Sequence, residues 1–493
     1  MTAINTNIGA IQAQSNMGRV SEEYNQAMTR LSSGKRINAA KDDAAGMAIG
    51  EKMTAQIKGL NQAVRNATDA KSLVDTTEGA HVEVSNMLQR MRELSVQSAN
   101  DTNTDADRNN INAEAQQLVA EINRVAETTT FNGMNILDGS FKGKQFQIGA
   151  DSGQTLNVNV DSAAANDIGA YTFKTDVQIT GAGTTDSGIT GTPQYTVSGS
   201  KGSQTFGVAA GTSARDFAQT VNDSSATTGV EATATTKARL TLDVADTISF
   251  TLGNATGTDE QVSIRDVNVA TTSDLRGVRD AVNAVSGSTG ITATMGNTNA
   301  EVILTDQDGD DIGIESFNNN GGSATMTVET LQADGSVKAE GSATTAVANG
   351  DSVYVTGQVE MTSTESFEVS ADDNTTVTSF VESNEFASKS SVASIDLTTA
   401  QGATDAIKVL DAALQKISEA RSDLGAVSNR LDSTISNLTN ISTNVEAARS
   451  GIMDADFAKE STDLARGQIL QQAATSMLAQ ANSSQQNVLS LIR

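Results

Sequence analysis

Apolar residues at helical spacing characterise the N-terminal part of the chain. A stripe with steps of three and four runs from Met17 to Leu31 and stops at Ser32-Ser33-Gly34. Asp42-Asp43 then suits the start of a second helix, because acidic side chains complement the positive end of a helix dipole. No strong helix breaker follows until Asn100. The pattern predicts one helix near residues 17–31 and a second over residues 43–100, roughly 87 Å long at 1.5 Å per residue.

The C-terminal part carries a longer helical pattern. From Ile407 to Val445, apolar or small residues alternate steps of three and four over more than five heptads. A second seam of this spacing begins at Leu470 and continues to the last residues. Such spacing is typical of coiled-coil packing, so we expect partner helices at the opposite end of the chain and in other subunits. The residues predicted to pack in this way are Met17, Val20, Tyr24, Leu31, Leu470, Met477, Val488 and Leu491.

Turn residues separate these helices from a middle region of a different kind. A third helix is predicted around residues 105–128, and Asn132-Gly133 and Asp138-Gly139 mark tight turns after it. Alternating apolar residues on either side of Asp151-Ser152-Gly153 predict a β-hairpin. Residues 176–400 are rich in Thr, Ser, Gly and Asp, with short runs typical of strands.

The middle region contains an internal repeat. Val221-Asn222, Gly229-Val230 and Ala232-Thr233 are echoed 61 residues later by Val282-Asn283, Gly290-Ile291 and Ala293-Thr294. The matched internal spacing predicts two related modules, at about 213–254 and 273–317. We expect each to be a short helix that leads into a β-hairpin.

Together these patterns predict an α+β fold. The N- and C-terminal segments form a long antiparallel coiled-coil rod, and the β-rich centre is an insertion that projects outward. Residues 1–44 and 450–493 are the terminal helices, residues 45–175 and 401–449 form the rest of the rod with a small hairpin, and residues 176–400 form the insertion.

Charge and composition narrow the function. The net charge is −27, from 33 Lys and Arg against 60 Asp and Glu, and residues 176–400 alone carry 9 against 30. Near-neutral ends can associate without charge repulsion, whereas the acidic middle stays solvated and is not expected to bind nucleic acid. The chain has no run of 18 apolar residues, so no membrane span is predicted. The N-terminus lacks the features of a cleavable signal peptide.

Few residues suit catalysis or metal binding. The chain has no cysteine and one histidine, His81, which lies on an apolar stripe and is interpreted as a packing residue. Asp306, Asp308, Asp310 and Asp311 surround Gly309, but the spacing does not match a calcium loop, so an acidic turn is the favoured interpretation. We expect no catalytic, cofactor or metal site.

Several long stretches resemble bacterial flagellin. They are LSSGKRINAAKDDAAGMAI at 31–49, GLNQAVRNATDAKSLVDTTEGA at 59–80, LQRMRELSVQSAN at 88–100, TTFNGMNILDG at 129–139 and NVLSLIR at 487–493. The resemblance covers about 1–180 and 400–493. It implies a structural subunit that leaves the cell unfolded by type III export and polymerises into the extracellular flagellar filament for motility. In that family the terminal helices form an inner tube, longer helices an outer tube, and the insert projects outward.

The resemblance also implies partners. Besides copies of itself, these are an export chaperone, the filament cap and hook-associated proteins. Residues 88–97 resemble the segment bound by Toll-like receptor 5, which implies contacts from Arg90, Leu94 and Glu114, and residues 488–493 resemble the part recognised by NAIP receptors.

Three alternatives to a filament subunit arise. A hook–filament junction protein would share the export route, although the continuous matches favour flagellin. A flagellin with a zinc protease in its middle would need a His-Glu-x-x-His motif, which one histidine cannot build. An adhesive insertion is neither favoured nor disfavoured by any residue pattern.

Overall fold

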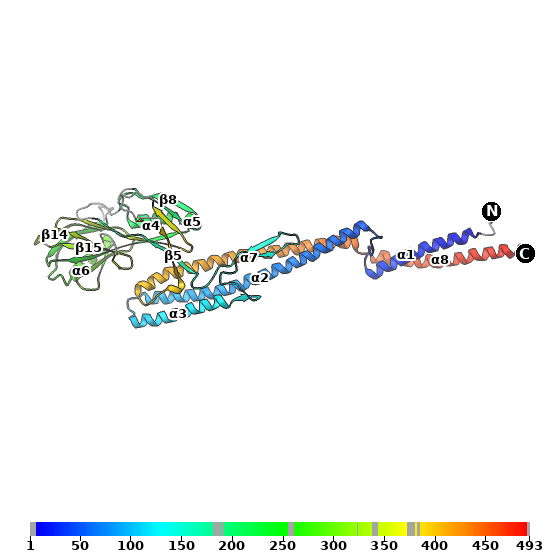
Figure 1. The fold of residues 1–493 in the computed structure, drawn as a ribbon, viewed down its shortest axis with the longest axis horizontal. Helices are drawn as coiled ribbons and strands as arrows, with labels where there is room; N and C mark the ends of the chain where they lie inside the picture. Colours follow the sequence, from blue (N-terminus) through cyan, green and yellow to red (C-terminus); the bar gives the residue numbers. More distant parts are fainter. Residues whose placement is uncertain are drawn as a thin grey trace. The chain divides into compact units, whose positions relative to one another are not determined.

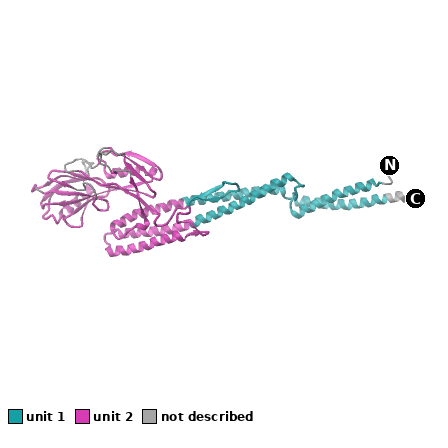
Figure 2. Ribbon diagram, in the orientation of Figure 1, with its two compact units in different colours: residues 1–76, 142–159, 423–493 teal, residues 77–141, 160–422 magenta. Residues whose placement is uncertain are grey.

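The computed structural model describes residues 6–180, 189, 192–254, 261–322, 324–337, 344–371, 380–381 and 385–490. The chain divides into two compact units (Figure 2). The first, here the terminal unit, comprises residues 1–76, 142–159 and 423–493. The second, the central unit, comprises residues 77–141 and 160–422.

Five long helices supply most of the chain outside the β-rich middle. Local capping explains where several of them begin: the Asn7 side chain accepts a hydrogen bond from the N–H of Ala10, Asp43 accepts one from Gly46, and Thr104 and Asp107 form a capping box. The predicted second and third helices are confirmed. The helices are α1 (Ile8–Ser33), α2 (Ala44–Ser98), α3 (Asp105–Thr128), α7 (Ala400–Met453) and α8 (Phe457–Ser490).

In the terminal unit, α1 and α8 lie side by side and antiparallel (Figure 1). The Asn7 side-chain amide donates to the carbonyl of Ala481 at 3.2 Å, and Arg30 pairs with the buried Glu460 at 3.3 Å. Between these contacts Gly467 lies against Tyr24, where an added Cβ would stand 3.3 Å from that of Tyr24. The contacts fix one register along the whole pair.

The rest of the terminal unit holds the remaining helix pairing and the small hairpin. Leu60 and Ala63 of α2 pack against Leu438 of α7. Strands β3 (Lys144–Gln147) and β4 (Thr155–Val158) form the predicted antiparallel hairpin. Asn66 donates to the carbonyl of Gln147 at 2.9 Å, which ties the hairpin to α2.

In the central unit, the last turns of α2 are joined to α3 by the Arg90–Glu114 ion pair and to the start of α7 by the Arg92–Asp411 ion pair. Arg108 of α3 is buried and donates from its three guanidinium nitrogens to the carbonyls of Ser98, Asn100 and Asn103 at 3.0–3.1 Å. These carbonyls belong to the end of α2 and the turn after it, so Arg108 closes that helix. The predicted Asn132-Gly133 turn is confirmed between β1 (Thr130–Phe131) and β2 (Met134–Asn135), and η1 (Val392–Ser394) precedes α7.

The described residues of the β-rich middle form three antiparallel sheets. The first, of five strands, has the order β11 (Val262–Asn268), β10 (Thr247–Asn254), β14 (Ile312–Asn319), β17 (Val353–Thr356) and β6 (Gln178–Ile179). The second has the order β12 (Thr292–Met295), β13 (Val302–Asp306), β9 (Glu231–Leu242), β18 (Gln358–Ser363), β5 (Gly169–Lys174) and β21 (Ser388–Ser391), with β15 (Met326–Leu331) beside β9 and β16 (Thr344–Val347) beside β15. The third has the order β20 (Glu385–Phe386), β19 (Glu368–Ala371), β7 (Gln194–Ser198) and β8 (Ser203–Gly207).

The long strand β9 links two hydrophobic cores. Its first half contributes Ala232 to a core that includes Phe217 and Tyr195. Its second half contributes Leu240 to a separate core that includes Phe317. One strand therefore takes part in both cores of the middle region.

The sequence repeat corresponds to a structural repeat, although its order differs from our expectation. Helix α4 (Ala214–Asp223), followed by the short α5 (Ser225–Thr228), comes after the β7–β8 hairpin, and α6 (Arg276–Thr289) comes after the β10–β11 hairpin. Each module is thus a hairpin, a helix and then a strand. The expected hairpin after the helix is confirmed for β12 and β13 but is wrong for the first copy, because β9 pairs with β13, β15 and β18 rather than with β10.

The repeated asparagines explain why the two copies share their spacing. The Asn222 side chain both donates to the carbonyl of Ala232 and accepts from its N–H, at 2.9 and 2.7 Å. Asn283 makes the same two bonds to Ala293, at 2.9 and 2.8 Å. Each asparagine thus fastens a helix to the strand ten residues further on, in place of a backbone partner.

Candidate self-association surface

The predicted stripe of α1 lies on the side of the helix that packs in the terminal unit. Met17, Val20, Tyr24 and Leu31 are half-buried, in line with the buried Ala27, and Tyr24 contacts Gly467 of α8. This is the outcome expected for a seam between two helices.

The predicted seam of α8 divides between two faces. The side that lies against α1 carries Glu460 and Gly467, and partly buried Leu464, Gln471, Ala474, Leu478 and Ala481 continue the same spacing. Leu470 and Met477 are 42% and 65% exposed, so the structure does not bring them against the α1 stripe. They lie on another side of the helix, so their predicted packing, which included neighbouring subunits, stays a prediction. The side chain of Val488 and the whole of Leu491 fall outside the described part of the chain.

Large apolar side chains are exposed along both helices of this pair. Several of them lie off the regular stripes, so helical spacing does not predict them, and only their size and apolar character could have indicated them. Exposed apolar side chains of this size on one helix pair are candidates for contact with another copy of the chain. The exposed residues, here called the outer apolar surface, are Ile8, Ile11, Met28, Phe457, Ile469, Leu470 and Met477.

The register of the pair brings two of these residues to the same level. Asn7 contacts Ala481, and the two helices are antiparallel. Ile11 lies four residues after Asn7 and Met477 four residues before Ala481, so these two residues lie at the same level of the pair. Both are mostly exposed, at 57% and 65%. The outer apolar surface therefore includes residues of both helices at one end of the pair.

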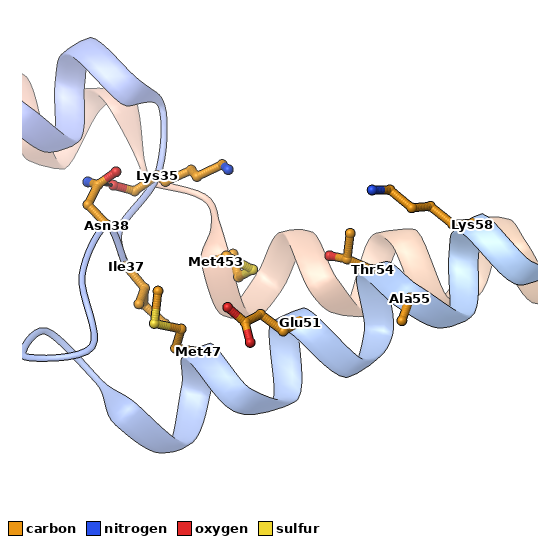
Figure 3. Close-up of a pocket in the computed structure, with 9 residues that line it drawn as sticks. All are labelled: Lys35, Ile37, Asn38, Met47, Glu51, Thr54, Ala55, Lys58 and Met453. Carbon is orange, nitrogen blue, oxygen red and sulfur yellow. Dashed lines mark hydrogen bonds between the residues drawn. The ribbon is translucent and has the colours of Figure 1, made fainter.

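At the other end of the pair, the segment between α1 and α2 is joined to the segment between α7 and α8 by backbone hydrogen bonds. Arg36 donates its N–H to Met453 at 2.7 Å, and Ala455 donates to Gly34 at 3.0 Å, around a bridge between Lys35 and Asp454. A hollow of about 470 Å³ adjoins this bridge. Figure 3 shows its lining, in which Ile37, Met47 and Met453 gather, while the side chains of Lys35 and Lys58 extend toward each other from the two sides of the view.

The residues implied in receptor recognition lie in the central unit. Arg90 of α2 pairs with Glu114 of α3 and with Glu93, each at 2.9 Å, and both Arg90 and Glu114 are about half exposed. Leu94 is only 1% exposed and packs in the helical core. Arg90 and Glu114 thus form a surface pair above a buried Leu94.

His81 is buried, as its place on an apolar stripe predicts. It is 1% exposed, and neither ring nitrogen has a hydrogen-bond partner among the described residues. Burial, together with the nearby charge of Arg421, lowers the pKa of His81 to about 4, against weaker opposing effects of Asp161 and Glu78. The ring is therefore neutral at physiological pH.

Hydrogen bonds and an ion pair within the protein stabilise the acidic turn between β13 and β14. One carboxylate oxygen of Asp306 accepts hydrogen bonds from the N–H groups of Asp308, Gly309 and Asp310, while Asp310 pairs with Arg215 at 2.7 Å. Burial raises the pKa of Asp306 to about 6. Within the described residues, no three acidic or histidine side chains converge as metal ligands.

The described helices also include none that is both long and apolar enough to span a membrane. The described residues thus combine paired terminal helices, which expose large apolar side chains, with a β-rich middle.

Comparison with known proteins identifies the family. Residues 4–142 match the bacterial flagellin N-terminal helical region, residues 407–492 the bacterial flagellin C-terminal helical region, and residues 247–308 the flagellin hook IN motif. The chain is 39% identical to B-type flagellin of Pseudomonas aeruginosa, 35% to a flagellin of Salmonella typhimurium and 34% to polar flagellin C of Vibrio parahaemolyticus, with 99% of both chains covered each time.

The chain therefore belongs to the bacterial flagellin family. It is a structural protein and not an enzyme, a subunit of the extracellular flagellar filament that serves motility.

Proposed function

We propose that this filament subunit polymerises through the outer apolar surface of α1 and α8. The observation that carries the proposal is the exposure of seven large apolar side chains on one pair of helices. Burial of apolar surface contributes about 25 cal/mol per Å², so copies of the chain gain free energy when they cover these side chains for each other. The predicted packing residues take two roles: Met17, Val20, Tyr24 and Leu31 hold α1 to α8, whereas Leu470, Met477, Val488 and Leu491 contact neighbouring subunits.

A pair of charge substitutions tests this surface. Ile11→Glu and Met477→Glu introduce a charge where the monomer is exposed, so the monomer should keep its fold by circular dichroism. Both should fail to elongate filament seeds, since burying an unpaired carboxylate is unfavourable. Phe386→Glu is the matched control, because Phe386 is 75% exposed but lies on β20 of the central unit. Normal polymerisation of both helix variants contradicts the proposal.

The proposed places of the chain segments in the filament follow the sequence prediction. Residues 1–44 and 450–493 form the inner filament core, residues 45–175 and 401–449 the surrounding rod, and residues 176–400 the outer insertion with modules at about 213–254 and 273–317. Removing about 40 residues from either end should abolish assembly and leave the β-rich middle folded.

The same helical surface is proposed to serve flagellar partners. An export chaperone would cover the outer apolar surface of α8 before secretion, and the filament cap and hook-associated proteins would meet the subunit during assembly. A junction protein is the alternative function, since it would share these contacts. Quantifying the chain in sheared filaments decides between them, because a filament subunit is the major component and a junction protein is present in few copies.

Recognition by host receptors is a second proposed role. Arg90 and Glu114 are exposed and joined at 2.9 Å, which presents a fixed polar pair to Toll-like receptor 5, while buried Leu94 supports the helix beneath them. Residues 488–493 are the proposed contact for NAIP receptors.

Arg90→Ala should weaken activation of the receptor by purified monomer at least tenfold, roughly the loss of one charged hydrogen-bonded contact. Arg124→Ala is its matched control, because Arg124 is an exposed arginine of α3 that also pairs with a glutamate, Glu121. Equal activation by wild type and Arg90→Ala contradicts this role.

A further inference from the structure

The chain concentrates its oxidisable side chains in methionine. It has 13 methionines, no cysteine and no tryptophan, and its single histidine is buried. Two-electron oxidants attack sulfur first, and an exposed thioether reacts faster than a buried one. The positions of the exposed methionines therefore decide where an oxidant acts on this protein.

Those positions fall mainly on the proposed contact surface. Met91, Met326 and Met361 are fully buried. Among the described residues, the most exposed methionine is Met477, at 65%, followed by Met28 at 47%. Both belong to the outer apolar surface, on α8 and α1.

We propose that Met477, with Met28, is an oxidation site through which peroxide-type oxidants block assembly of the unpolymerised subunit. This inference rests on the proposed polymerisation surface. The thioether sulfur attacks one oxygen of hydrogen peroxide, the O–O bond breaks, a sulfur–oxygen bond forms and water leaves. The sulfur is oxidised to a sulfoxide and the peroxide is reduced, without any other reactant.

Oxidation of the methionine sulfur makes burial of its side chain at a subunit contact unfavourable. A sulfoxide is a polar acceptor, and an acceptor that enters an apolar contact without a hydrogen bond opposes that contact. In the monomer the oxidised side chain stays in water, so the fold of the terminal unit is unaffected. In the filament the neighbouring subunit covers Met477, so the same sulfur is protected once assembly is complete.

The reaction is tested on purified full-length monomer. Treatment with hydrogen peroxide, followed by peptide mass spectrometry, should show Met477 and Met28 oxidised before Met91 and Met361. Elongation of filament seeds should slow roughly tenfold or more. Incubation with methionine sulfoxide reductases of both stereospecificities should restore it. Assembled filaments should be oxidised at Met477 at least about tenfold more slowly than monomer.

Leucine variants separate this site from general damage. Met28→Leu/Met477→Leu keeps the apolar side chains but cannot form a sulfoxide, and it should elongate equally well with and without peroxide. Met134→Leu is the matched control, because Met134 is 45% exposed but lies on β2 of the central unit, and it should remain as sensitive as wild type.

Three results would overturn the inference: undiminished elongation by monomer oxidised at Met477, equal sensitivity of the double leucine variant and wild type, or oxidation of Met477 in filaments at the rate of the monomer. A different failure tests the proposed function. If the untreated Ile11→Glu and Met477→Glu monomers polymerise normally, the surface itself is wrong, whatever peroxide does.

Discussion

His81 gives the central unit a predictable sensitivity to acid. The ring is buried beside Arg421, and its pKa falls from 6.5 to about 4 on folding. The unfolded chain therefore binds a proton at higher pH than the folded chain. Stability is fully present above about pH 6.5 and is lost as the pH falls toward 4, because ∂ΔG/∂pH is positive wherever the unfolded state binds more protons.

The size of the effect follows from the difference in pKa. Each unit corresponds to about 1.4 kcal/mol, so the full window between the two pKa values amounts to about 3 kcal/mol. At about pH 5, which stays above the isoelectric point near 4.3, about 2 kcal/mol of this is lost relative to pH 7.5. His81→Leu removes the titration and keeps an apolar side chain in the stripe.

The assay compares two proteins at two pH values. Urea unfolding of wild type and His81→Leu is followed by helical circular dichroism at about pH 7.5 and about pH 5. Carboxylates such as Asp306 also titrate in this window, but they are common to both proteins and cancel in the comparison. Wild type should lose about 2 kcal/mol more than His81→Leu on acidification. Equal losses in the two proteins would refute the argument from burial.

Two further predictions concern residues that hold backbone groups. Asn222→Ala and Asn283→Ala each leave a buried N–H and carbonyl without their side-chain partner, so each should lower the free energy of unfolding of the central unit by about 1–3 kcal/mol, whereas Asn109→Ala on the surface of α3 should change it little. Arg108→Ala should lower the free energy of unfolding by about 3 kcal/mol, the upper value for hydrogen bonds from a charged group, as measured by urea unfolding. Arg108→Lys should recover only a minor part, because one ammonium cannot reach the three carbonyls that the guanidinium spans. Full recovery by lysine would show that charge alone matters there.

Helical periodicity was the most informative signal in the sequence. The predicted limits of α2 and α3 are close to those observed, because caps such as Asp43 and Thr104 are local in sequence. The half-burial of the α1 stripe was also predictable. Exposure of Leu470 and Met477 was not, since a face of a helix can be apolar for a partner within the chain or for another copy.

The β-rich middle was predictable in content but not in connectivity. Repeat spacing revealed two modules, yet the partner of each strand depends on contacts far apart in sequence. Strand β9 pairs with strands up to about 130 residues away, and no local pattern specifies those partners. The roles of Asn222 and Asn283 were within reach, because their repetition at one spacing already set them apart.

The hydrogen-bonded bridge at Lys35 and Asp454 has a mechanical consequence. Under torsion, a single extended connection between two helices would rotate about its backbone bonds. Here two antiparallel connections are bonded to each other, through Arg36 and Met453 on one side and Gly34 and Ala455 on the other. The two connections therefore rotate together, so torque on one helix pair of the terminal unit is transmitted to the other.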